Sequence, residues 1–182
     1  LNTARSALAG AGTSPSAAVA FGGSPSNKNE TELFDGSSWT EVNNLNTGRS
    51  VLAAAGSSTA ALAFGGSVSP KAQTESWNGT NWTEVNDLNE PRDYLAGCGT
   101  STNALAVAGY APSASSSVDS TEVWNGTNWT EVNDLNRPEG SVGAAAGIYT
   151  SALYMSGEED PGTVPTLCES WNGTNWTEVN DI

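Results

Sequence analysis

The chain has 182 residues, with 6 Lys and Arg, 20 Asp and Glu and no His, which gives a formal net charge of −14. A protein this acidic repels nucleic-acid phosphates and anionic lipid headgroups, so neither nucleic acid nor membrane insertion is expected. Without His, the commonest general base and metal ligand is missing, and we expect no cofactor and no metal site.

Four repeats fill almost the whole chain, and each opens with a Leu-Asn pair, at Leu1, Leu45, Leu88 and Leu135. Each repeat also ends with a near-identical Trp-Thr-Glu-Val-Asn block, which starts at Trp39, Trp82, Trp129 and Trp176. Internal repeats of this length indicate one structural unit per repeat. The sequence therefore predicts a single domain over residues 1–182, with units at 1–44, 45–87, 88–134 and 135–182.

The first repeat shows how each unit divides into short strands. Residues 6–12 are small and apolar, residues 17–21 read Ala-Ala-Val-Ala-Phe before a Gly-Gly pair, and two further runs follow at 31–34 and 38–42. In the later repeats the last two runs are joined by Asn-Gly, as at Asn78-Gly79, which is a strong hairpin signal. Each repeat is therefore predicted to form four antiparallel strands.

Four-stranded units that cannot bury both faces alone are expected to pack around an axis as the blades of a β-propeller. A β-solenoid is the rival, but it favours shorter repeats and parallel strands. The first strand of each repeat is rich in Ala and Gly, which suits the crowded axis, while the Trp residues lie in the outer strands. The sequence thus predicts an all-β protein of four four-stranded antiparallel blades, forming a ring that closes by packing blade 4 on blade 1.

Several residues of these repeats resemble the kelch repeat. In the second repeat they are Arg49, a strand that ends in Ala63-Phe64-Gly65-Gly66, the turn Trp77-Asn78-Gly79, and Trp82. The fourth repeat departs from the pattern, with Glu139 in place of Arg. The near-unvaried Trp-Asn-Gly-Thr-Asn-Trp block also resembles recently amplified propellers of marine phages and bacteria. The resemblance implies a kelch-like propeller.

The repeated charged residues are interpreted as structural. One Glu recurs in every repeat, at Glu32, Glu75, Glu122 and Glu169, and equal copies cannot provide the unequal environments that acid–base catalysis requires. The Arg residues are expected to bond carbonyls or pair with these acids. Cys98 and Cys168 lie at non-equivalent places, and we expect two buried free thiols rather than a disulfide.

The loop after the second strand is what differs between the repeats. It covers residues 24–30, 67–73, 110–120 and 158–166, and variable loops on a constant scaffold are where recognition is expected. The candidate ligand-binding residues are Tyr110, Asp119, Glu158, Glu159 and Asp160. Glu158-Glu159-Asp160 lacks the spaced pattern of a Ca²⁺ loop, so it is interpreted as solvated charge.

These features favour a non-enzymatic binding or structural module, extracellular or on a virion, such as a phage fibre, tail or decoration protein. Its expected partner is a host-surface glycan or protein, or a neighbouring virion subunit. A purely architectural subunit contact is a second hypothesis. A carbohydrate-active or oxidising propeller enzyme is a third and weaker one, since the copper oxidases of the kelch type need His ligands that this chain lacks.

Overall fold

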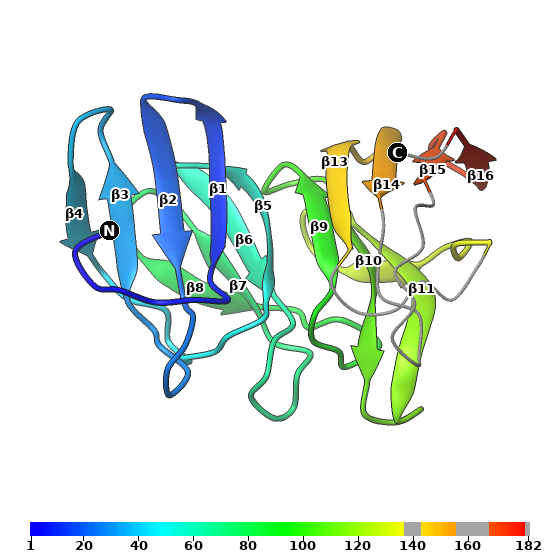
Figure 1. Cartoon of the computed structure of the whole chain (residues 1–182), viewed down its shortest axis with the longest axis horizontal. Coiled ribbons are helices and arrows are strands. Elements are labelled where there is room, and N and C mark those ends of the chain that lie inside the picture. Colours follow the sequence, from blue (N-terminus) through cyan, green and yellow to red (C-terminus); the bar gives the residue numbers. More distant parts are fainter. Residues whose placement is uncertain (137–142, 156–167, 181–182) are drawn as a thin grey trace.

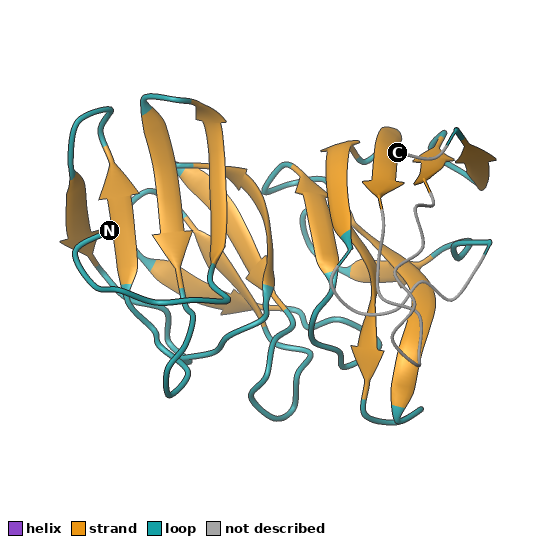
Figure 2. Cartoon of the chain, in the orientation of Figure 1, coloured by secondary structure: helices purple, strands orange, loops and turns teal. Residues whose placement is uncertain are grey.

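The computed structural model describes residues 1–136, 143–155 and 168–180, and in these residues it contains strands and loops without helices (Figure 1, Figure 2). The strands form four sheets of four antiparallel strands each, and the four sheets are arranged as a four-blade β-propeller. Within the described residues there is no helix with the length and apolarity needed to cross a lipid bilayer.

Each blade takes four consecutive strands in chain order, so no crossover is needed. Blade 1 contains β1 (Ala9–Ser14), β2 (Ala17–Phe21), β3 (Thr31–Phe34) and β4 (Trp39–Val42). Blade 2 contains β5 (Ala53–Ser57), β6 (Ala60–Phe64), β7 (Thr74–Trp77) and β8 (Trp82–Val85). Blade 3 contains β9 (Ala96–Gly99), β10 (Ala104–Ala111), β11 (Ser116–Trp124) and β12 (Trp129–Glu131). Blade 4 contains β13 (Ala144–Ile148), β14 (Ser151–Met155), β15 (Cys168–Trp171) and β16 (Trp176–Val179).

The predicted strands agree with these bounds except at the first strand and in blade 3. The first strand begins later than the predicted 6–12, because Ser6 instead forms an isolated bridge to Ser24 in the loop after β2. In blade 3, most of the predicted loop 110–120 is strand, since β10 and β11 continue past a β-bulge between Val107 and Gly109. Only residues 112–115 remain as the connection between them.

The four first strands of the blades are innermost, as the Ala- and Gly-rich composition predicts. Contacts between successive blades join β1 to β5, β5 to β9 and β9 to β13. Backbone bonds next to the axis add to these contacts, because Val51 N donates to Ala7 O and Tyr94 N donates to Val51 O, each at 2.9 Å. Small side chains let the backbones of neighbouring blades approach this closely.

The outer half of each joint between blades is filled by Trp. Trp82 of blade 2 packs edge-on against Phe21 of blade 1, with ring centroids 4.7 Å apart, and its Nε1 donates to Thr31 Oγ1 at 3.0 Å. The same indole-to-hydroxyl bond joins Trp129 to Thr74 at 3.1 Å. The wedge that opens between diverging blades is thus closed by a large ring whose single donor is satisfied.

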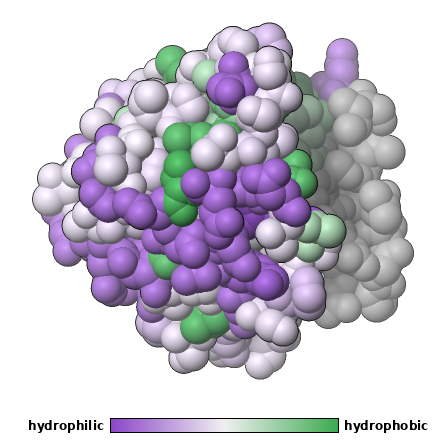
Figure 3. All heavy atoms as spheres, turned by 90° about the vertical axis from the view of Figure 1, so that its left-hand side faces the viewer, coloured by the Kyte–Doolittle hydropathy of each residue, from purple (hydrophilic) through white to green (hydrophobic). Residues whose placement is uncertain are grey.

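The expected packing of blade 4 on blade 1 is not observed among the described residues. No contact comparable to that between β1 and β5 joins β13 to β1. Figure 1 shows blades 1 and 4 extending to opposite sides of the molecule, with β4 at one end and β16 at the other. The side that carries blade 1 is mostly hydrophilic with separate apolar patches (Figure 3). In the part of the chain that the structure describes, the four blades therefore form an arc that is open between blade 1 and blade 4.

Candidate functional site

The loops after β2, β6 and β10 and the connections from β4 to β5 and from β8 to β9 lie at one end of the arc, which we call the loop end. Tyr110 lies on β10 at this end and exchanges backbone hydrogen bonds with Asp93 in the connection between β8 and β9, at 2.8 and 3.1 Å. The hairpin of blade 3 is thereby tied to the connection that leaves blade 2.

Lys71, from the loop between β6 and β7, covers the Tyr110 ring. Its Nζ lies 5.8 Å from the ring centroid and 2.7 Å from Asp93 Oδ2. Asp93 Oδ1 is buried without a hydrogen-bond partner. The cation is therefore held between a carboxylate and an aromatic face, which fixes the position of the β6–β7 loop relative to blade 3.

The first hollow of the loop end, which we call the proline hollow, lies beside this contact and has a volume of about 450 Å³. Three segments from two blades meet there, and the lining residues are Ser69, Pro70, Lys71, Pro91, Pro112 and Ser113. Rigid apolar proline rings at the rim and one ammonium group provide a preformed surface that loses little conformational entropy on binding.

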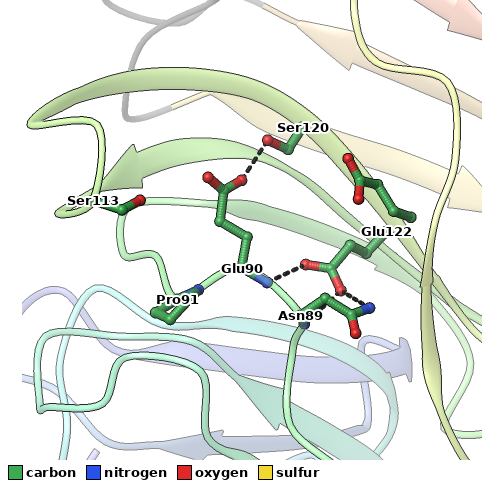
Figure 4. A pocket seen from close by; sticks show the side chains of 7 residues that line it. Asn89, Glu90, Pro91, Ser113, Ser120 and Glu122 are labelled. Carbon is green, nitrogen blue, oxygen red and sulfur yellow. Dashed lines mark hydrogen bonds between the residues drawn. The ribbon is translucent and has the colours of Figure 1, made fainter.

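The second hollow, which we call the acidic hollow, shares Pro91 and Ser113 with the proline hollow and has a volume of about 360 Å³. Its lining is Asn89, Glu90, Pro91, Ser113, Ser120, Glu122 and Glu131. In Figure 4 the Glu90 carboxylate points toward Ser120, whose Oγ donates to it at 2.5 Å. Glu122 accepts from the Asn89 side chain at 2.9 Å and from the Glu90 backbone at 3.2 Å.

Glu122 belongs to a buried ion pair beneath the acidic hollow. Arg92 Nη2 lies 3.1 Å from Glu122 Oε1, and both side chains are almost completely buried. Burial lowers the pKa of Arg92, and the facing Glu122 carboxylate opposes that shift. Arg92 also donates to the carbonyls of Ser120 and Ala106. The carboxylate of Glu122 is therefore paired with a cation inside blade 3.

The same pair recurs in blades 1 and 2, as the interpretation of the repeated charges expects. Arg5 lies 2.9 Å from Glu32, and Arg49 lies 3.2 Å from Glu75. Burial likewise lowers the pKa of Arg49, against the effect of Glu75. Across residues 1–136, 143–155 and 168–180, no three His, Cys, Asp or Glu side chains gather closely enough to hold a metal ion.

The residues predicted for ligand binding are placed only in part. Tyr110 is half-buried beneath Lys71, and Asp119 is half-buried on β11, with its carbonyl accepting from Leu135 N at 3.1 Å. Neither residue lines the two hollows. Glu158, Glu159 and Asp160 lie outside the described residues. Cys98 and Cys168 are both buried free thiols, as predicted.

No protein-family model matches the chain, and no curated protein matches it in sequence. The candidate site is therefore identified from the positions and chemistry of its residues alone. Lys71 and Ser113 lie in the variable loops 67–73 and 110–120, but the sequence singled out neither residue. Glu90 and Pro91 lie outside those loops and were missed, because these residues come from three different connections. A signal was present in the three prolines, Pro70, Pro91 and Pro112, one in each of the connections that meet here.

Proposed function

We propose that this protein is a non-enzymatic binding module with kelch-like repeats, on a virion or an extracellular surface, and that its loop end contacts a glycan or protein on a host surface. One observation carries the proposal. Two hollows lie side by side at the loop end, where the connections that differ between blades meet on a scaffold that repeats.

The lining favours a neutral sugar over an anionic one. Proline rings offer an apolar surface to the C–H face of a pyranose, while Glu90, Glu131 and Ser113 offer acceptors to its hydroxyl groups. A net charge of −14 repels sulfated or sialylated ligands. The ligand would lie across Pro91, which lines both hollows.

A purely architectural role is the second candidate. The specific observation in its favour is that the outward face of blade 4 leaves Leu153 and Val179 exposed, at 43% and 38%. Apolar side chains on one sheet face are typical of a surface that contacts another protein. The two roles are compatible, because this face and the loop end are different surfaces.

The test is binding of labelled protein to an array of neutral and acidic glycans. Ser113 is exposed and lines both hollows, so Ser113→Arg fills them without disturbing the core. We expect this change to weaken binding at least about tenfold and to leave the melting temperature unchanged. Tyr110→Ala removes the ring beneath Lys71 and is expected to weaken binding less.

The matched control is Asn125→Asp, at a repeated turn on the opposite end of blade 3, which is expected to bind normally. The proposal is wrong if Asn125→Asp loses binding while Ser113→Arg keeps it. It is also wrong if the wild-type protein binds neither glycans nor proteins of a host-cell surface. An activity toward sugars that disappears with Glu131→Gln would favour the enzyme hypothesis instead.

A further inference from the structure

The three joints inside the chain share one set of contacts, which defines what a complete joint requires. At each joint a Trp Nε1 of the following blade donates to a Thr hydroxyl of the preceding blade, at 3.0 to 3.1 Å. At each joint an Asn from the end of the preceding blade also bonds the Asn-bearing turn of the following blade. Asn43, for example, donates to Asn81 Oδ1 at 2.8 Å and to Thr80 O at 3.0 Å.

Blade 1 presents the face that receives a preceding blade, and in the described residues nothing fills it. Trp39 holds the position of Trp82, but it is only half-buried and its Nε1 has no hydrogen-bond partner among the described residues. It stacks on Phe34 of its own blade at 5.1 Å. Trp82, Trp129 and Trp176 are each only 5% exposed.

Blade 4 presents the complementary face, which is also open. Leu153 is 43% exposed, whereas Leu62 and Leu105, at the same register position in blades 2 and 3, are 0% exposed. Ile148 and Val179 lie on the same face of the blade and are exposed as well. At the complete joints a following blade covers the position of Leu153 and, in part, that of Val179, where Val42, Val85 and Val132 are half-buried.

We propose that these two faces form a head-to-tail interface between copies of this chain, with blade 4 of one copy packed on blade 1 of the other, and that two copies close one ring of eight blades. This inference goes beyond the proposed function and does not depend on it. Blades 1 and 4 extend to opposite sides of the arc (Figure 1), so a second arc can reach both open faces at once. A head-to-tail contact forms a closed ring when its rotation closes.

The residues on the two open faces fit this occupant. Met155 is half-buried and stands where Phe21 and Phe64 meet the Trp ring. A thioether makes favourable contacts with aromatic rings. Cys168 stands at the position of Thr31 and Thr74 but is already buried in the single chain, so no hydrogen bond to the incoming indole is assigned to it. Asn180 follows β16 as Asn43 follows β4, so it can donate to the turn that contains Ser38 of the other copy.

The test is the mass of the purified chain in solution, measured by light scattering and native mass spectrometry over a dilution series. We expect a dimer of twice 18.6 kDa that dissociates on dilution, with no larger species. Leu153→Glu on blade 4 and Trp39→Ser on blade 1 are each expected to give a monomer, because each change removes one side of both joints in the ring. Buried charge without a partner strongly opposes association.

Tyr94→Glu is the matched control, since Tyr94 is 45% exposed and lies in the connection between β8 and β9 rather than on a strand of blade 1 or blade 4. It is expected to remain a dimer. Hydrogen exchange gives a second measurement, in which dimer formation protects β4 and β16 and leaves β8 and β12 unchanged. A monomer at every concentration, an open-ended series of larger species, or a dimer that survives both face variants would overturn the proposal.

Discussion

At the scale of single residues, the buried Arg–Glu pair of blades 1, 2 and 3 is the feature that costs most when it is broken. The Arg92 side chain is 0% exposed and the Glu122 side chain is 1% exposed. Arg92 also donates hydrogen bonds to two backbone carbonyls besides the carboxylate. Removing one member leaves the other charge buried and unpaired. The free energy of unfolding then falls by much more than it would if both members were replaced with apolar side chains.

Arg92→Met is therefore expected to lower the free energy of unfolding by about 3 to 5 kcal/mol, measured by urea denaturation. The double variant Arg92→Met with Glu122→Gln is expected to recover part of this loss, because no unpaired charge remains. Lys28→Met is the control, since the Lys28–Glu30 pair at 3.2 Å is partly exposed, and we expect a loss below about 1 kcal/mol. Equal losses for Arg92→Met and Lys28→Met would contradict this account.

The Cys98 thiol gives a pH-dependent prediction. Burial raises its pKa from an ordinary 9.0 to about 11. The folded state therefore keeps the proton more tightly than the unfolded state, and this stabilisation is complete below about pH 9 and is lost as pH rises toward 11. Two pKa units correspond to about 2 to 3 kcal/mol.

Unfolding free energies of the wild type and of Cys98→Ala, measured by urea denaturation from about pH 8 to pH 11, separate this contribution from other groups that titrate there. We expect the wild type to lose more stability than the variant across this range. The native thiol is also expected to react with a thiol reagent at neutral pH only after unfolding. Parallel pH profiles for the two proteins would show that the thiol does not contribute.

At the scale of elements, the turn between the third and fourth strands fixes the register of each blade's outer hairpin. Asn78 Oδ1 accepts from the backbone N–H groups of Thr80 and Asn81 at 2.9 and 2.8 Å, and Gly79 has a φ of 91°. Blade 1 makes the same turn with Asp35, whose pKa is lowered by the N–H groups of Ser38 and Ser37. The turn therefore needs a side-chain acceptor of this length.

Asn78→Asp is accordingly expected to keep the wild-type melting temperature at neutral pH, because a carboxylate already fills this role in blade 1. Asn78→Ala removes both bonds and is expected to cost about 1 kcal/mol, seen as a lower midpoint in thermal or urea unfolding. If Asn78→Asp destabilised the protein as much as Asn78→Ala, the acceptor role assigned to this side chain would be wrong.

At the scale of the whole molecule, stability comes from joints between blades rather than from each blade alone. Each of the three apolar clusters of the core contains residues of two neighbouring blades, as Phe21 with Trp82 and Phe64 with Trp129 illustrate. Coupling of this kind, in which each repeat is stabilised by its neighbours, is typical of repeat architectures. Among the described residues the end blades are covered by a neighbouring blade on one face only, so we expect them to be the least stable parts of the arc.

Trp82→Ala is therefore expected to cost about 3 to 5 kcal/mol, because it empties a closed joint and leaves Thr31 without its donor. Trp39→Ala removes the same side chain from an open face, and in dilute protein it is expected to cost less than half as much. Chemical denaturation of both variants at the same low concentration measures the contrast. Similar losses would mean that blade 1 is covered in the monomer.

The sequence by itself determined the four repeats, the antiparallel order of the strands, the inner position of the Ala-rich strands and the buried thiols. These features follow from local patterning, since a turn such as Asn78-Gly79 and an apolar run such as residues 60–64 act within one repeat. Only the tertiary structure decided that, among the described residues, the arc is open between blade 1 and blade 4, and that Lys71, Pro91 and Ser113 meet at one hollow. Closure of the ring depends on the rotation between neighbouring blades at each joint. The hollow depends on connections that are distant in sequence. Neither can therefore be deduced from the pattern of a single repeat.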